Sequence, residues 1–246
     1  MNTAARLAAL WVPGLDTTAL TLPHARQTAD RLALPDGDPD RQALLALAEL
    51  HHRADGPSCE RVVDTRAGRQ DRLEALAARA VRVRSAGTLV PGGLRTPDYA
   101  RLLGATAAGS RYEPTTAEPV GAESVVVLDE SALHQSHGRP HVVADQFGHL
   151  IRAARAGTVA VSLAPTTNPH RTACVTHLRF ADRGPDLTVV EQPDRVVYLL
   201  TGTPSERRAR AVLGRWLRQA TDRTGVLERL AGARAALRAL DRAPPG

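Results

Sequence analysis

The chain has 246 residues and an apolar content of 43%, which suits one sizeable globular domain or one domain with a small appendage. Its net charge of +6 permits contact with nucleic acid, but the chain has no block of five or six basic residues, and the arginines are spread among Asp and Glu as on a solvated surface. It has no apolar run near 18 residues and no signal-peptide pattern, so we expect a cytoplasmic protein without a membrane span, in which Cys59 and Cys174 form no disulfide.

Helical patterns dominate the first third of the chain. Proline near the start of each segment predicts helices over residues 23–34 and 38–50. Residues 53–63 predict a loop, helped by Gly and Pro. Leucine and alanine then recur at helical spacing, which predicts one amphipathic helix over about 66–85.

A proline-glycine turn and a new helix follow. Pro91 and the two glycines after it cannot continue a helix, so they predict a turn. Thr96 is placed to cap the next helix, Pro97 takes its first position, and Tyr99 faces inward. Residues 104–121 are rich in Gly, Ala and Thr, and we expect them to form a flexible loop.

The stretch 125–138 holds the strongest strand signal and two carboxylates. Four branched apolar residues, 125–128, predict a buried strand. Asp129 then stands at the N-cap of a short helix, and Glu130 lies in its first turn, where the helix dipole favours a negative charge. Gly138 is a suitable stop for this segment.

The second half predicts strands between helices. A helix is expected over 140–156, and the final helices over 203–220 and 225–241. Alternating apolar residues predict the intervening strands, at 159–163, 174–180, 187–191 and 195–201. Short turns between these strands predict antiparallel pairing. We therefore expect an α+β fold, an antiparallel sheet flanked by helices with a short helical N-terminal appendage.

The spacing of these segments resembles a bacterial family of regulators that join an XRE-type helix-turn-helix domain to a C-terminal domain of unknown function. The family's typical Val-Pro-Gly-Leu-Leu-Gln-Thr and Tyr-Ala-Arg runs correspond to residues 90–96 and 99–101, and its Leu-Asp-Glu-x-x-Leu run to 128–133. Further matches are Gln146-Phe147, residues 163–165, His170 and the Val-Val-Tyr strand at 196–198. The likeness covers about residues 62–240, with Gly93 and Arg95 replacing a leucine and a glutamine.

The resemblance implies the family's effector domain at residues 61–246. Residues 1–60 then form a degenerate helical remnant of the helix-turn-helix domain. Reading the major groove needs a helix that presents side chains to base edges, and residues 1–21 show no such helix. The resemblance also implies a small partner protein, while DNA is not an expected partner. We leave a homodimer open.

Six residues are candidates for function. Asp129, Glu130 and His170 are the catalytic candidates. The two carboxylates stand at the end of a buried strand, where they can work as acid and base. His170 lies in a loop after a strand, where ligand contacts are common. For the same residues, a helix cap, a first-turn charge and a loop histidine are the structural alternatives. Arg95, in a glycine-rich turn before a helix, can hold an anion or remain a surface residue. Tyr99 and Tyr198 complete the ligand-binding set.

No metal or cofactor is expected. His134, His137 and His141 have spacings that can share a helix face, but Gly138 and Pro140 interrupt that helix. No phosphate loop, dinucleotide fingerprint or serine nucleophile motif is present.

Three functions remain open. The first is a non-catalytic effector domain that binds a small molecule or a partner protein. The second is a cofactor-independent biosynthetic enzyme, a cyclase or lyase, in which Glu130, Asp129 or His170 moves a proton and Arg95 stabilises an oxyanion. The third is a DNA-binding repressor.

Overall fold

A computed structural model describes the chain at residues 22–31, 33–36, 41, 45, 48, 61–65, 68–77, 80–103, 123–137, 139–166, 173–180, 186–200, 202–220 and 225–242. Most of the predicted helix at 38–50 and of the loop at 53–63 lies outside these residues, as do the loop at 104–121, Gly138 and His170; the three described residues of the first segment, Arg41, Leu45 and Ala48, are helical. Helix α2 (Leu22–Arg31) is the first described element; it begins one residue before the predicted helix at 23–34 and ends three residues before its end.

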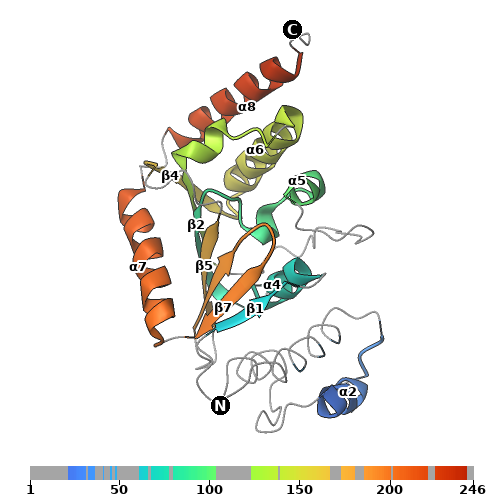
Figure 1. Cartoon of the computed structure of the whole chain (residues 1–246). Helices are drawn as coiled ribbons and strands as arrows, with labels where there is room; N and C mark the ends of the chain where they lie inside the picture. The colour runs from blue at the N-terminus through green and yellow to red at the C-terminus, as the bar shows by residue number, and fades with distance from the viewer. Residues whose placement is uncertain are drawn as a thin grey trace.

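A mixed seven-stranded sheet forms the centre of the fold (Figure 1), in the order β1-β7-β6-β5-β2-β3-β4. The strands are β1 (Arg61–Asp64), β2 (Ala80–Gly87), β3 (Glu123–Asp129), β4 (Ala160–Ala164), β5 (Cys174–Phe180), β6 (Leu187–Glu191) and β7 (Val196–Leu200). Strands β2, β3 and β4 are parallel, whereas β5, β6, β7 and β1 continue the sheet from β2 in antiparallel pairs.

Helices cover the sheet on both faces. Helices α4 (Arg69–Ala77), α5 (Pro97–Leu102), α6 (Pro140–Arg155) and α8 (Val226–Arg242) lie on one side, and α7 (Pro204–Gln219) lies on the other (Figure 1). The larger core packs α6 and α8 against β3 and β4 through Phe147, Leu150, Leu163 and Leu230. A smaller cluster holds α7 to the sheet through Leu213 and Trp216.

Threonine N-caps followed by proline begin two of the helices. The Thr96 hydroxyl accepts the Tyr99 N–H at 3.3 Å, with Pro97 in the first helical position. Thr203 accepts the Glu206 N–H at 3.2 Å in the same way, and it begins α7. These bonds satisfy backbone donors that have no partner inside the helix. The α+β class and the flanking helices predicted from the sequence are confirmed.

Three local predictions are wrong. The expected helix over 66–85 ends at Ala77, because residues 80–87 form β2 and pair on both sides, with β3 and β5. The end of the expected loop at 53–63 is strand β1, which pairs with β7. The sheet is mixed rather than wholly antiparallel, because long connections containing α5 and α6 return the chain to parallel neighbours of β2 and β3. None of the described helices has the length and hydropathy needed to span a bilayer.

Candidate functional site

The carboxyl ends of the three parallel strands bring several predicted residues to one edge of the sheet. The turn after β2 leads to Arg95 and α5. Strand β3 ends at Asp129, Glu130 follows it directly, and α6 comes next in the chain. In α/β sheets, ligands commonly bind outside the carboxyl ends of parallel strands. This edge is therefore the part of the fold where a binding site is expected.

Asp129 and Glu130 both have partners at this edge. The buried Asp129 carboxylate accepts the Ser131 N–H at 2.8 Å and the Thr166 hydroxyl at 2.9 Å, so it caps the short 3₁₀ helix η2 (Glu130–His134) and ties the end of β3 to the residues after β4. The half-buried Glu130 carboxylate lies 2.6 Å from Arg229 of α8. The N-cap and first-turn positions expected of the two residues are confirmed.

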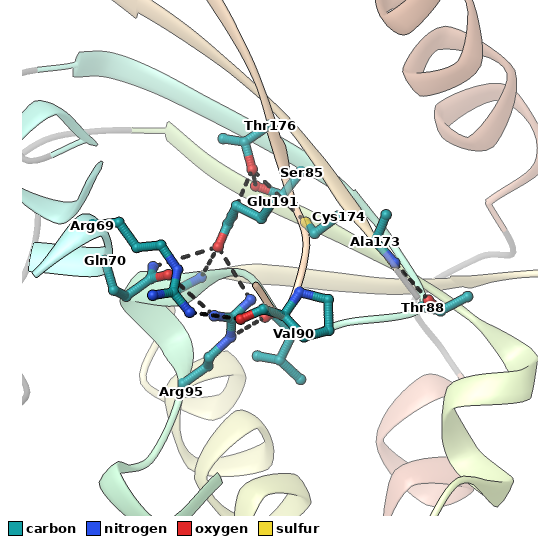
Figure 2. Close-up of polar contacts among 12 residues, drawn as sticks. Arg69, Gln70, Ser85, Thr88, Val90, Arg95, Ala173, Cys174, Thr176 and Glu191 are labelled. Atoms are coloured by element: carbon teal, nitrogen blue, oxygen red, sulfur yellow. Dashed lines mark hydrogen bonds and ion pairs between the residues drawn. The ribbon is translucent and has the colours of Figure 1, made fainter. Parts of the chain in front are cut away.

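Arg95 lies inside the protein, where it is 3% exposed. Its polar contacts are drawn in Figure 2. Its guanidinium donates from Nε to the Val90 carbonyl at 2.7 Å, from Nη1 to Gln70 Oε1 at 3.1 Å and from Nη2 to Glu191 Oε2 at 3.1 Å. Glu191, at the end of β6, is 1% exposed. The resulting ion pair is buried on both sides and joins the turn after β2 to the antiparallel half of the sheet.

Glu191 is the centre of this network. Besides Arg95, its carboxylate accepts the Gly92 N–H at 3.1 Å, the Gln70 side chain at 3.4 Å and the Thr176 hydroxyl at 3.4 Å. A Cβ on Gly92 would stand 1.3 Å from Gln70 Nε2, so the packing of Gln70 requires glycine at this position. Buried charges are stable only when they are paired and hydrogen-bonded, as Arg95 and Glu191 are here.

A buried glutamine fixes the start of α5 to α6. Gln146 of α6 accepts the Thr96 N–H with Oε1 and donates from Nε2 to the Leu94 carbonyl, both at 2.7 Å. The turn that contains the family-like Val-Pro-Gly motif is therefore held from two sides, by Gln146 and by Glu191. This motif positions α5 against α6.

The two candidate tyrosines are both core residues. Tyr99 is 3% exposed and meets the His137 ring edge-on at a centroid distance of 6.2 Å. Tyr198 is 2% exposed and lies in β7, between β1 and β6. Burial raises the pKa of both hydroxyls, and in Tyr198 the nearby Asp64 carboxylate raises it further. Both phenols therefore remain neutral at physiological pH.

An open depression of about 440 Å³ lies between α5 and the first turn of α6. Its lining combines charged and apolar side chains: Asp98, Arg101, Leu102, Arg139, His141 and Val142. Arg101 pairs with Asp98 at 2.5 Å, and His141 with Asp241 of α8 at 3.0 Å. Within the described part of the chain, the exposed Arg139 guanidinium has no hydrogen-bond partner, so it is the lining cation that is available to a ligand.

The structure brings some predicted residues together and separates others. Arg95 and Tyr99 lie on the same turn and helix, and Asp129 and Glu130 share the carboxyl edge, while Tyr198 is in the antiparallel half. Sequence reasoning missed Glu191 and Arg139. Glu191 could have been identified from the sequence, because it ends a well-predicted strand on the side whose alternating residues are apolar and buried. No pattern in the sequence marks Arg139 as a functional residue.

Residues 72–232 match the family model described as Domain of unknown function (DUF5753). The chain belongs to this family. The match runs from within α4 to within α8 and includes strands β2 to β7, whereas β1 and Gln70 precede it. The Arg95–Glu191 ion pair and the residues that line the depression therefore belong to the DUF5753 domain. No curated protein and no solved structure matches the chain. Whether the candidate residues bind or catalyse stays a prediction.

Proposed function

We propose that this DUF5753 domain is a non-catalytic effector domain of the helix-turn-helix regulator type, and that it binds a small organic anion in the depression between α5 and α6. The observation that carries the proposal is Arg139, an exposed cation at the start of α6 that has no partner among the described residues. Leu102 and Val142 supply apolar surface beside it. A carboxylate or phosphate with an attached apolar group matches this lining.

Two further features support binding at this place. The depression is formed by helices that follow the carboxyl ends of parallel strands, where ligands are expected in such sheets. Both of its walls are fixed from inside by Gln146 and the Arg95–Glu191 pair, so its shape exists before a ligand arrives. Preorganisation of this kind reduces the free-energy cost of binding.

The test is a thermal-unfolding screen against a panel of small carboxylates and phosphates, each matched with its uncharged amide or alcohol. A ligand at a hundred times its Kd stabilises the folded state by about 2.7 kcal/mol. For a domain of this size the increase in Tm is then roughly 5–10 °C. The panel is repeated on Arg139→Gln and on Arg155→Gln, a control at the opposite end of the same helix.

We expect at least one anion to raise Tm in the wild type and in Arg155→Gln, and to lose the effect in Arg139→Gln. The proposal fails if no anion stabilises the protein, or if stabilisation is unchanged in Arg139→Gln.

A further inference from the structure

Helix α7 exposes a row of arginines on the opposite face of the sheet from the depression. It carries five arginines, all exposed: Arg207, Arg208, Arg210, Arg215 and Arg218. Its one carboxylate, Glu206, is 1% exposed; it accepts bonds from the Thr188 hydroxyl and the Gly202 N–H, and it lies 3.5 Å from Arg210, so it offsets one of the five charges. The solvent-facing side of α7 is therefore strongly positive.

The sheet beside α7 extends this charge. Ala86 of β2 and Val175 of β5 pack under α7, so residues two and four positions away on each strand face the same side. These residues include Arg82 and Arg84 of β2 and Arg179 of β5, which are partly or fully exposed. Glu123 pairs with Arg82 at 2.7 Å and with Arg84 at 3.6 Å, and it neutralises only part of the charge.

An exposed apolar side chain lies among the helix arginines. Val212 is 42% exposed, and it stands four residues after Arg208 and three before Arg215. Residues at these spacings share one side of a helix, so the three side chains form a single ridge. Leu213 and Trp216, one position further on, point into the sheet and fix the rotation of the helix. Arg215 and Arg218 have no side-chain acceptor among the described residues.

We propose that this α7 ridge, Arg208–Val212–Arg215 with Arg218 beside it, binds an acidic segment of a partner protein. Protein interfaces combine an apolar centre with arginine around it. Arg208 and Arg215 are two turns apart, about 10.5 Å along the helix, which matches carboxylates two turns apart on a partner helix. The phosphates of a nucleic acid could also pair with Arg208 and Arg215. They would then lie against the apolar Val212 side chain, which fits a protein partner better.

The probe is a fluorescent amphipathic peptide of about 20 residues, with glutamates two turns apart around a leucine. A second peptide has glutamine in place of every glutamate, and a third probe is a duplex DNA of similar length. Binding to the full chain is measured by anisotropy at low and moderate salt. The variants are the double Arg215→Glu/Arg218→Glu and the single Val212→Asp.

The matched control is the double Arg152→Glu/Arg155→Glu on α6, on the other face of the sheet. It changes the net charge by the same amount as Arg215→Glu/Arg218→Glu. In both double variants the substituted arginines lie near the C-terminal end of a helix. Circular dichroism and thermal unfolding establish that each variant is folded before binding is compared. This control separates binding at the α7 ridge from general attraction to a positive protein.

We expect the acidic peptide to bind, and the α7 double to weaken it about tenfold or more while the α6 double changes it less than about twofold. Val212→Asp should also weaken it, and the glutamine peptide should not bind. The proposal is overturned if the acidic peptide does not bind, if both doubles weaken it equally, or if Val212→Asp has no effect. It is also overturned if DNA binds more tightly than the peptide and loses its affinity in the α7 double.

Discussion

The buried ion pair between Arg95 and Glu191 allows a stability prediction whose size follows from the structure. Their side chains are 2% and 1% exposed. Glu191→Gln keeps the shape of the side chain and an oxygen for the Gly92 N–H, but it removes the negative charge beside Arg95. Breaking a buried pair at one partner costs about 3–5 kcal/mol, because the remaining charge is left without compensation.

This cost is large compared with the total stability of a domain, about 5–15 kcal/mol. We therefore expect Glu191→Gln to fold with a clearly lower urea midpoint. The control is Glu123→Gln, since Glu123 pairs with Arg82 at 2.7 Å but both side chains are more than a third exposed, at 50% and 37%. An exposed pair of this kind contributes about 1 kcal/mol or less.

A double-mutant cycle tests the explanation itself. Arg95→Met alone leaves the Glu191 carboxylate buried without its cation, whereas Arg95→Met with Glu191→Gln leaves no charge at all. The loss of unfolding free energy in the double variant should therefore be smaller than the sum of the losses in the two single variants, by about 2 kcal/mol. Urea titrations give the midpoint and the slope for all four proteins. The reasoning is refuted if Glu191→Gln costs no more than Glu123→Gln, or if the two single effects simply add.

Two further predictions concern the same turn and the histidines. Gly92→Ala displaces Gln70 from its bonds to Arg95 and Glu191, and it should lower the free energy of unfolding by about 1–3 kcal/mol in a urea titration. The control is Gly93→Ala, whose Cβ meets no atom within 4 Å and should cost much less. Equal losses of stability in the two variants would contradict the packing argument. Burial lowers the pKa of His137, His149 and His177, so the unfolded chain binds more protons and stability should fall as pH drops through about 6.5. His137→Asn, which tolerates the φ of 48° at this position, should reduce that slope in urea midpoints measured from pH 5 to 8; an unchanged slope would exclude His137 as a contributor.

Local sequence determined the elements whose signals lie within a few residues. Thr96 with Pro97, Asp129, and Thr203 with Pro204 begin their helices as expected, because a cap is a bond between a side chain and a backbone N–H two or three residues away. Strand β6 begins and ends where the alternation and the flanking turns predict. The α+β class was also predictable, since it depends on the order of helical and alternating segments along the chain.

Only the tertiary structure decided β2 and the position of Arg95. Residues 80–87 form a strand because β3 and β5 supply hydrogen bonds on both sides, although the alternation of valine and arginine at 81–84 was a signal for it. Arg95 is internal because Glu191, 96 residues away, offers it a buried carboxylate. The packing of distant strands decides such partners, and the local sequence around a cation does not predict which carboxylate will pair with it.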